Sequence, residues 1–411
     1  MKKILILGSG TAGTMMANKL RNALDREDWD ITIVDKDKVH YYQPGFLFIP
    51  FGIYNKSDVV KPKSDFYPVG VNVVFSEIDR VVASENKVLL TDGKILYYDF
   101  LIIATGVQTY PEETNGLKDK LWYKDIFDFY TVEGAVALQK HFKSWQGGKL
   151  VMAITEMPFK CPVAPIEFVC LADAYFTKIG IRDKVEISFV TPLSGAFTKP
   201  IATKMLSELL KEKNINIIPD FYIESVDNEN KKLISYDEKE IAFDTLVIVP
   251  MNMGDKMIER SGLGNDMNFV PTDKHTLQSK EHENIFVIGD ATDLPTSKAG
   301  SVAHFSGEIL HENILSAIEG RPLNAKFDGH ANCYIETGFG KGALIDFNYE
   351  TEPLPGKFPL PGLGPFGLLK NTKINHYGKI IFRWIYWHLL LKGKQLPIDA
   401  HMTMAGKNKV S

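Results

Sequence analysis

The sequence predicts an α/β protein with two Rossmann-like domains, each of three β/β/α layers, and a C-terminal α+β region. Three observations support this fold class. A glycine-rich turn follows the first apolar strand, two later apolar strands end in small or acidic residues, and the middle of the chain repeats the strand–helix–strand order. With 411 residues, 45% of them hydrophobic, the chain can form two or three domains with substantial cores.

The first element is a strand–turn–helix–strand unit. An apolar strand at residues 4–7 runs into the turn GSGTAG at residues 8–13, and a helical run follows at residues 15–24. A second strand, residues 31–34, ends at Asp35. This order is typical of a dinucleotide-binding βαβ unit, although the glycine pattern alone also occurs by chance.

Each glycine of this turn has a separate expected role. Gly8 permits the tight turn, Gly10 lets a pyrophosphate approach the backbone, and Gly13 lets the helix pack closely on the strand. The phosphates would lie at the helix N-terminus, and Asp35 would bind a ribose hydroxyl. The unit therefore predicts a dinucleotide site but leaves FAD, NAD and NADP open.

The next elements complete the first domain. Residues 38–52 are rich in aromatics, glycine and proline, which indicates either a loop packed on the core or a wall beside a flat cofactor. Residues 71–91 alternate as strands of a small antiparallel sheet with a turn at 84–86. Residues 98–106 form a buried strand that ends in Ala104-Thr105-Gly106.

The early fingerprint and the later Ala-Thr-Gly segment together resemble the two-dinucleotide-binding flavoproteins, in which the first fingerprint binds FAD. A second family signature, NIFVIGD at residues 284–290, ends in Gly289-Asp290, although this aspartate could also be a turn or N-cap residue. The helix expected near residues 297–318 would present its N-terminus to the flavin, where a reduced flavin carries negative charge. The resemblance implies FAD contacts from Gly8, Gly10, Thr11, Ala12, Gly13, Asp35, Lys36, Tyr42, Pro44, Ile78, Ala104, Thr105, Gly106, Gly289, Asp290, Lys298 and Ala299.

The middle of the chain keeps the βαβ order but lacks a second glycine fingerprint. A strand at residues 150–154, a helix at about 166–179 and a strand at 185–190 are expected. No glycine occurs between Gly148 and Gly180, and Pro162 and Pro165 remove two N–H donors. A pyrophosphate could not approach this backbone closely, so NADH is not the expected electron donor.

A cysteine occupies the position of the missing glycine turn. Cys161 precedes the expected helix, where the helix N-terminus and Lys160 would lower the pKa of its thiol. The segments CPVAPIEF and KVEISFVTP resemble the sulfide:quinone oxidoreductases and the flavocytochrome c sulfide dehydrogenases, over essentially the whole chain. This resemblance implies that Cys161 and Cys333 form a redox pair that oxidises hydrosulfide; the alternative is two unrelated structural thiols. Cys170 is expected to be a buried apolar side chain.

The chain also departs from that family pattern. Many members have a third cysteine, sometimes bonded to FAD, but residues 122–131 contain none and have Tyr130 there instead, so non-covalent FAD is expected. A histidine that many members carry is absent from residues 191–196. Glu167 is therefore the first candidate for proton handling, although it could equally cap its helix or form a surface ion pair.

The C-terminal region is basic and aromatic. Residues 353–398 contain no acidic residue but seven basic ones, and residues 380–391 are apolar, too short to span a bilayer, and interrupted by Arg383 and His388. This composition suits a helix lying in a membrane interface, the alternative being a core-packed or dimer-interface helix. An acceptor quinone would then contact residues among Gly300, Phe339, Lys379, Phe382, Arg383, Trp384 and Tyr42.

Together these observations predict FAD-dependent oxidation of sulfide to polysulfide or sulfane sulfur, with two electrons passed to a membrane quinone. The alternatives are a type II NADH:quinone oxidoreductase or the flavin subunit of a flavocytochrome c sulfide dehydrogenase-like complex. The expected domains are residues 1–110 and 246–325, which form a discontinuous FAD domain, residues 111–245 and residues 326–411.

The same composition predicts where the protein resides and what it binds. Residues 1–7 do not form a signal peptide and no apolar run approaches the ~20 residues of a membrane span, so a peripheral, monotopic protein on the cytoplasmic membrane is expected. A net charge of −4 suggests no nucleic-acid partner, and three cysteines suggest neither a disulfide scaffold nor a zinc site. A homodimer or homotrimer is expected.

Overall fold

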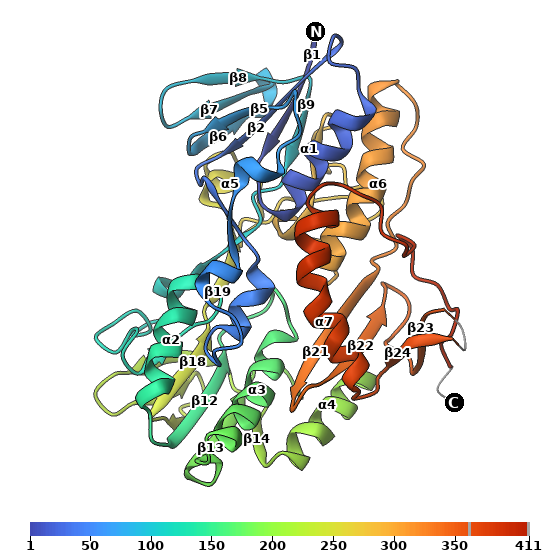
Figure 1. Ribbon diagram of the computed structural model, residues 1–411. Helices are drawn as coiled ribbons and strands as arrows, with labels where there is room; N and C mark the ends of the chain where they lie inside the picture. Colours follow the sequence, from blue (N-terminus) through green and yellow to red (C-terminus); the bar gives the residue numbers. More distant parts are fainter. Residues whose placement is uncertain (361–362, 409–411) are drawn as a thin grey trace.

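The computed structural model describes residues 1–360 and 363–408 and has the α/β architecture that the sequence predicts (Figure 1). Two five-stranded sheets, each entirely parallel, form the upper and lower left parts of the molecule. A smaller four-stranded sheet with one long helix forms the lower right. Each parallel sheet is covered by helices on one face and by a three-stranded antiparallel sheet on the other.

The first parallel sheet is built from both ends of the chain. Its strands, in spatial order, are β20 (Ile285–Val287), β9 (Phe100–Ile103), β1 (Lys2–Leu7), β2 (Trp29–Asp35) and β5 (Asn72–Phe75). Alternate residues of β1 face opposite layers. Ile4 and Ile6 pack against α1 (Thr11–Ala23) and α6 (Gly300–Ile318), whereas Leu5 and Leu7 face the antiparallel layer β6 (Ile78–Val82), β7 (Lys87–Leu90) and β8 (Ile95–Tyr97).

Residues 71–91 differ in part from the expected antiparallel sheet. The β6–β7 hairpin is antiparallel and turns at residues 83–86, as predicted, with Asn86 in the left-handed conformation (φ +48°). The preceding strand β5, however, pairs in parallel with β2, because it completes the edge of the large sheet. Alternation alone does not distinguish these two partners.

The second parallel sheet repeats the same three layers. Its strands, in spatial order, are β11 (Ile126–Phe127), β18 (Thr245–Val249), β12 (Gly148–Ile154), β13 (Val185–Val190) and β14 (Ile215–Ile218). The helices α2 (Val132–Ser144), α3 (Ala164–Lys178) and α4 (Pro200–Glu212) cover one face, and β15 (Ile223–Asp227), β16 (Lys232–Ser235) and β17 (Glu240–Ala242) cover the other. The second βαβ scaffold is therefore present although its glycine fingerprint is not.

Two pairs of short strands connect these parts of the chain. The antiparallel pair β10 (Val107–Tyr110) and β19 (Met251–Gly254) carries the chain out of the first sheet and back. The remaining elements near this junction are β3 (Val39–Tyr41), its antiparallel partner β4 (Val60–Pro62), and the short helix α5 (Lys256–Arg260). Because β20 and α6 follow this return, the first nucleotide-type unit is discontinuous, while its exact boundaries stay a prediction.

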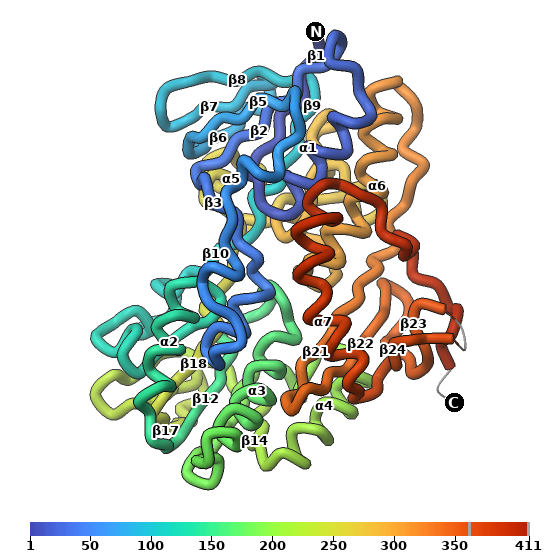
Figure 2. The backbone as a smooth tube through the Cα atoms, viewed as in Figure 1, coloured from blue at the N-terminus to red at the C-terminus, as the bar shows by residue number. Residues whose placement is uncertain are grey.

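The C-terminal region has the predicted α+β character. Its sheet has the order β21 (Ala331–Gly338), β22 (Lys341–Phe347), β24 (Gly364–Leu368) and β23 (Gly356–Leu360). Helix α7 (Lys373–Ile385) lies against β21 and β22 and runs upward toward α1 and α6, as Figure 2 shows. A further helical turn, residues 386–390, follows it, and Asn18 of α1 donates a hydrogen bond to the Leu391 carbonyl at 3.1 Å.

Helix α7 starts earlier than the apolar run at residues 380–391 indicated. Thr372 caps it by accepting a hydrogen bond from the Asn375 N–H at 3.1 Å. The residues that it adds are amphipathic, with Asn375 and Lys379 buried and Ile374 and Tyr377 exposed. Within residues 1–360 and 363–408, no helix is long and apolar enough to cross a membrane.

Candidate functional site

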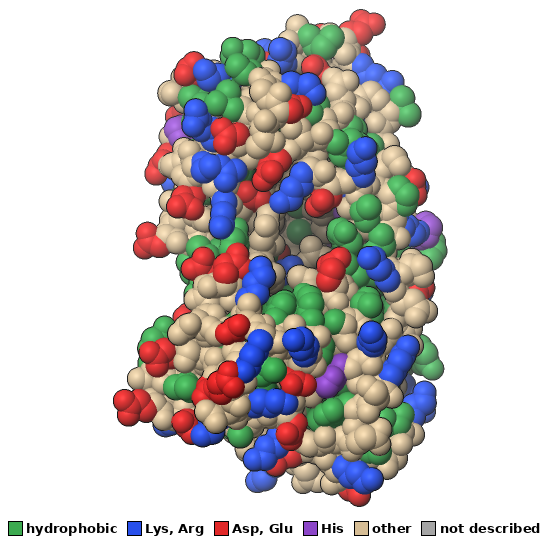
Figure 3. All heavy atoms as spheres, turned by 90° about the vertical axis from the view of Figure 1, so that its left-hand side faces the viewer, with side chains coloured by type: hydrophobic (Ala, Val, Ile, Leu, Met, Phe, Trp, Pro, Cys, Tyr) green, Lys and Arg blue, Asp and Glu red, His purple; other side chains and the backbone are tan. Residues whose placement is uncertain are grey.

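A cavity of about 510 Å³ lies where the carboxyl ends of the first parallel sheet meet α3, β21 and α7. Ligands of open α/β sheets bind at this end of the strands. The space-filling view in Figure 3 shows that the protein face to the left in Figure 1 is hollowed at mid-height, where the upper and lower parts of the molecule meet. Acidic and basic side chains are interspersed on this face.

Most of the predicted cofactor-binding residues line this cavity. They are Gly8, Gly10, Thr11, Ala12, Asp35, Lys36, Pro44, Ile78, Ala104, Thr105, Gly106, Gly289, Asp290, Lys298 and Ala299. They come from the ends of β1, β2, β9 and β20, from the segment before α6, from the short helical segment at residues 43–48 and from the start of β6. Seven separate parts of the sequence thus converge on one space.

Two predicted cofactor residues, Gly13 and Tyr42, are not on the cavity wall. A Cβ at Gly13 would be 1.9 Å from the Gly8 carbonyl oxygen, so Gly13 serves the close helix–strand packing expected of it. Tyr42 as a cofactor contact is wrong. Its ring is 1% exposed and packs on Tyr386, with the ring centroids 4.9 Å apart, while its neighbour Pro44 lines the cavity.

The glycine turn leaves backbone exposed to the cavity. Gly8 has φ +90°, and a Cβ there would be 2.5 Å from the Ala104 carbonyl oxygen. At Gly10, in contrast, a Cβ would meet no atom of the described residues within 4 Å, so the cavity reaches the backbone there. Helix α1 begins at the next residue, which places a helix N-terminus at the cavity wall, as an anionic group requires.

Asp35 is fixed as a carboxylate at the end of β2. One of its oxygens, Oδ2, accepts hydrogen bonds from the Ser9 N–H (2.6 Å) and hydroxyl (2.9 Å) and pairs with Lys63 at 2.7 Å. Burial alone would raise the pKa of Asp35, but the Lys63 charge and these hydrogen bonds lower it overall. The carboxylate is therefore charged at the expected ribose position.

Polar side chains after β9 and around the start of α6 line the cavity. The hydroxyls of Thr105 and Ser301 are buried and have no hydrogen-bond partner among the described residues. Lys298 donates hydrogen bonds to the carbonyls of Asp290 and Thr292 at 2.8 Å each, and burial lowers its pKa to about 8. Unpartnered buried hydroxyls indicate room for a polar ligand here.

Cys161 and Cys333 line this same cavity, as half-buried free thiols. Cys161 lies between β12 and α3 in a left-handed conformation (φ +54°), and its N–H donates to the Lys298 carbonyl at 2.7 Å. Cys333 lies on β21. Cys170, in contrast, is buried in the middle of α3, as expected of an apolar side chain.

The expected lowering of the Cys161 pKa is wrong. Burial raises the pKa of this thiol to about 11, and the Glu167 carboxylate adds to the increase, against the opposing charge of Lys379. The N–H of Ala164, the first residue of α3, lowers this pKa, but by less than burial raises it. Burial likewise raises the pKa of Cys333. Either thiol needs a nearby base to become a thiolate.

Glu167 occupies neither of the two alternative roles, a helix cap or a surface ion pair. Its side chain is fully buried, pairs with Lys379 at 2.8 Å, and accepts a 2.7 Å hydrogen bond from the Glu336 N–H on β21. Its second oxygen has no partner among the described residues. Burial would lower the pKa of Lys379, but Glu167 and the neighbouring Cys161 raise it overall.

The predicted quinone contacts divide into two groups. Gly300, Lys379 and Phe382 line the cavity. Arg383 and Trp384 do not. Arg383 contacts Tyr54 and Asp58 instead, stacking over the Tyr54 ring and pairing with Asp58 at 3.3 Å, and Trp384 is 57% exposed.

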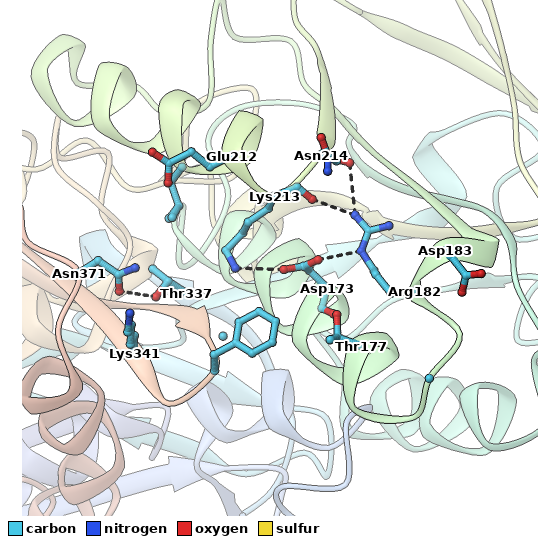
Figure 4. A pocket seen from close by; sticks show the side chains of 14 residues that line it. Asp173, Thr177, Arg182, Asp183, Glu212, Lys213, Asn214, Thr337, Lys341 and Asn371 are labelled. Atoms are coloured by element: carbon cyan, nitrogen blue, oxygen red, sulfur yellow. Dashed lines mark hydrogen bonds and ion pairs between the residues drawn. The ribbon is translucent and has the colours of Figure 1, made fainter.

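Phe339, another predicted quinone contact, also lies outside the cavity. It lies at the β21–β22 turn, 55% exposed, beside a second pocket of about 830 Å³ between α3 and α4. In that pocket Asp173 bonds to Arg182 at 2.7 Å and to Lys213 at 3.0 Å (Figure 4). Asp173 thus pairs with both of these basic side chains through its two carboxylate oxygens.

Sequence reasoning missed Tyr386. Its hydroxyl lies 2.7 Å from His40 Nε2 and 2.8 Å from Thr11 Oγ1, so it connects the end of α7 to the glycine turn. Lys379, Phe382 and Tyr386 all line the cavity and follow one another at helical spacing. The helical spacing of these three residues could have identified Tyr386 as a site residue from the sequence.

The chain is similar in sequence and in fold to several known proteins. Residues 2–144 match the family model of pyridine nucleotide-disulphide oxidoreductases. The sulfide:quinone oxidoreductase of the hyperthermophilic bacterium Aquifex aeolicus has a similar fold, with a TM-score of 0.78 and 20% identity, covering 96% of this chain and 92% of that one. A type II NADH:quinone oxidoreductase of Staphylococcus haemolyticus is 24% identical over 78% of this chain and 83% of its own length.

A higher identity is found with a mitochondrial sulfide:quinone oxidoreductase. The protein of Dictyostelium discoideum is 30% identical over 398 residues, which cover 95% of this chain and 86% of that protein. The chain thus belongs to the sulfide:quinone oxidoreductase family.

Proposed function

We propose that the protein is an FAD-dependent sulfide:quinone oxidoreductase that oxidises hydrosulfide to polysulfide or sulfane sulfur and passes two electrons to a quinone. One observation carries this proposal: Cys161 and Cys333 open onto the same cavity as the glycine turn of the dinucleotide site. Family membership supports the same activity.

The cavity fits FAD. The backbone at Gly10 and the N-terminus of α1 suit the pyrophosphate, the Asp35 carboxylate suits a ribose hydroxyl, and the unpartnered hydroxyls of Thr105 and Ser301 supply further hydrogen bonds. Among the described residues, Cys161 and Cys333 are the only cysteines that line this cavity. Tyr130, which stands in place of a third cysteine, has no thiol, so we expect no covalent bond to the flavin at this position. When bound, FAD supplies a two-electron acceptor that can be reoxidised by a second substrate.

The two cysteines supply the sulfur chemistry. Joined as a disulfide or through bridging sulfur, they present a bond that hydrosulfide attacks, which leaves a persulfide on one cysteine and a thiolate on the other. In the cavity this thiolate is stabilised by the positive charge of Lys379, which lowers the pKa of both thiols against the larger effect of burial. A second sulfide, or another thiolate, then removes the outer sulfur.

The Glu167–Lys379 pair holds and moves protons. It is buried, lines the cavity beside both cysteines, and leaves one carboxylate oxygen of Glu167 free among the described residues. Quinone reduction consumes two protons, and this pair is positioned to supply one to a quinone oxygen in the cavity, with Phe382 packing on the ring.

The exposed face of α7 is proposed to contact the membrane that contains the quinone. Ile374, Tyr377, Ile381 and Trp384 are each between 50% and 60% exposed and follow the helical repeat. Basic residues flank this stripe, among them Lys370, Lys373 and Arg383. An apolar stripe with basic flanks suits a helix lying in the interface of an anionic membrane.

The type II NADH:quinone oxidoreductases remain the nearest alternative, since they also resemble this chain. The segment after β12 argues against NADH, because it contains Pro158, Pro162 and Pro165 and has no glycine turn. A cytochrome as partner is favoured less, because the α7 stripe suits a lipid surface.

Anaerobic mixing with each donor tests the proposal. Sulfide should bleach the flavin absorbance of the purified holoenzyme within seconds, and NADH should not. Added soluble quinone should then restore the oxidised spectrum. Rapid bleaching of the flavin absorbance by NADH, with no bleaching by sulfide, would contradict the proposed function.

A further inference from the structure

A buried acid–histidine pair lies directly behind the Glu167–Lys379 pair. Glu336 on β21 is 1% exposed, and both of its carboxylate oxygens lie 2.9 Å from His376 Nδ1 on α7. The His376 side chain is 24% exposed and so reaches solvent. None of the chemistry described above uses these two groups.

The two pairs are connected through α3, β21 and α7. The Glu336 N–H donates to Glu167 Oε1 at 2.7 Å, the same oxygen that Lys379 Nζ binds at 2.8 Å. His376 and Lys379 lie one helical turn apart on α7, so their side chains share a face. The groups therefore form a series from the cavity, through Glu167–Lys379 and Glu336–His376, to the surface.

Glu336 is suited to exchange a proton near neutral pH. Burial, and then the negative charge of Glu167, raise the pKa of Glu336 to about 7, against the opposing effects of His376 and Lys379. Tyr54, from the loop after residue 48, and Cys170 of α3 also interact electrostatically with this carboxylate, and burial raises the pKa of both, which keeps them neutral. A group with a pKa close to the working pH both takes up and releases protons readily.

The proposed reaction needs such a route. Oxidation of HS⁻ to sulfane sulfur releases one proton and two electrons, whereas reduction of a quinone consumes two electrons and two protons. One proton must therefore enter from solvent in each turnover, whereas Glu167 and Lys379, the pair beside the two thiols, are buried.

We propose that His376 and Glu336 form the proton-entry route, which carries this proton from solvent to the Glu167–Lys379 pair during quinone reduction. His376 takes the proton at its exposed ring, Glu336 receives it through the 2.9 Å hydrogen bond, and Lys379 or Glu167 delivers it to the cavity. Transfer from Glu336 to Lys379 needs one water or a change of the Lys379 rotamer, because no direct hydrogen bond joins these side chains among the described residues. The inference rests on the proposed function.

Variants at both positions separate this role from a structural one. Enzyme reduced with dithionite is mixed with a soluble quinone, and the rate of flavin reoxidation is followed between about pH 6 and 9. Glu336→Gln and His376→Ala should slow reoxidation by at least about tenfold, with sulfide-driven reduction unchanged. Added imidazole should restore the rate of His376→Ala. His388→Ala, an exposed histidine on the same C-terminal helical segment, should behave like the wild type.

A second measurement does not depend on turnover. Infrared difference spectra recorded as the pH is changed should contain a carboxyl band that titrates near pH 7 in the wild type and is absent in Glu336→Gln. In His376→Ala the midpoint should move to higher pH, because His376 lowers the pKa of Glu336. The His388→Ala spectrum should match the wild type.

Two results would overturn the proton-entry route. The first is a rate of flavin reoxidation in both variants that equals the wild-type rate across the whole pH range. The second is an equal decrease in the rates of flavin reduction by sulfide and of reoxidation by quinone, with no rescue by imidazole, which would indicate a structural role. If wild-type enzyme reacts with neither sulfide nor quinone, the proposed function fails and the route fails with it. If the wild type reacts with sulfide and quinone and both variants react at the same rates, the proposed function is retained and only the proton-entry route is rejected.

Discussion

At the scale of single residues, the Glu167–Lys379 pair shows how tertiary contacts decide a side chain's role. From the sequence, Glu167 was a candidate for proton handling, a helix cap or a surface ion pair, because nothing local selects its partner. That partner is 212 positions away on α7, and the pair is buried. A partner so distant in the chain leaves no signal in spacing or periodicity.

Removing one member of this pair should destabilise the protein strongly. Lys379→Met leaves the Glu167 carboxylate buried without a counter-charge, which costs about 3–5 kcal/mol in comparable pairs. The double variant Glu167→Gln with Lys379→Met should recover most of this loss, since no charge remains buried. Urea unfolding midpoints of the wild type, Lys379→Met and the double variant check both statements, and equal midpoints for the single and double variants would contradict them.

His40 should make stability depend on pH. Burial, and then the charge of Lys63, lower its pKa to about 3, whereas the unfolded chain has the ordinary value of 6.5. The native state therefore binds fewer protons between pH 3 and 6.5, so stability falls as the pH decreases through this window. His40→Gln should flatten the fall by up to about 1.4 kcal/mol per pH unit.

Urea midpoints recorded at several pH values between 4.5 and 7 measure this slope. His388→Gln, an exposed control, should keep the wild-type slope. Parallel curves for wild type and His40→Gln would show that His40 is not the group responsible.

At the scale of elements, local sequence rules located the strands and helices that carry the site. The apolar runs predicted β1, β9, β12, β13 and β20, because buried parallel strands are continuously hydrophobic. The parallel pairing of β5 and the early start of α7 were not predicted. The first depends on a partner strand, and the second on a threonine cap before a polar first turn.

The exposed stripe of α7 should govern membrane binding. Replacing Ile381 and Trp384 with glutamate removes two apolar side chains and adds two negative charges, so partition into anionic vesicles should fall by at least about tenfold. A matched control replaces two other exposed apolar residues, Ile95 and Tyr236, with glutamate and should bind vesicles normally.

Vesicle sedimentation measures this partition, and FAD content and bleaching by sulfide serve as checks on folding. Unchanged binding of the α7 variant would contradict the assignment of this face. Loss of FAD from it would instead indicate that α7 is needed for folding of the site.

At the scale of the whole molecule, the sequence predicted which segments meet but not how their environment changes them. The fingerprint, Ala104-Thr105-Gly106, Gly289-Asp290 and the two cysteines were recognisable in combination, and each contributes residues to one cavity. The high pKa of Cys161 and the burial of Tyr42 were not predictable, because both depend on solvent exclusion by packed segments distant in the chain. Arg383 and Trp384 were misassigned for the same reason, since only the docking of α7 fixes which face meets the cavity.

The central claim is that sulfide reduces the flavin through Cys161 and Cys333, and anaerobic titration of the flavin spectrum with sulfide tests it most directly. Wild-type enzyme should be fully reduced by sulfide, whereas Cys161→Ser and Cys333→Ser should retain FAD and remain oxidised. Cys170→Ser, at a buried thiol away from the cavity, serves as the matched control and should be reduced like the wild type. Full reduction of the Cys161→Ser and Cys333→Ser enzymes by sulfide would contradict the account.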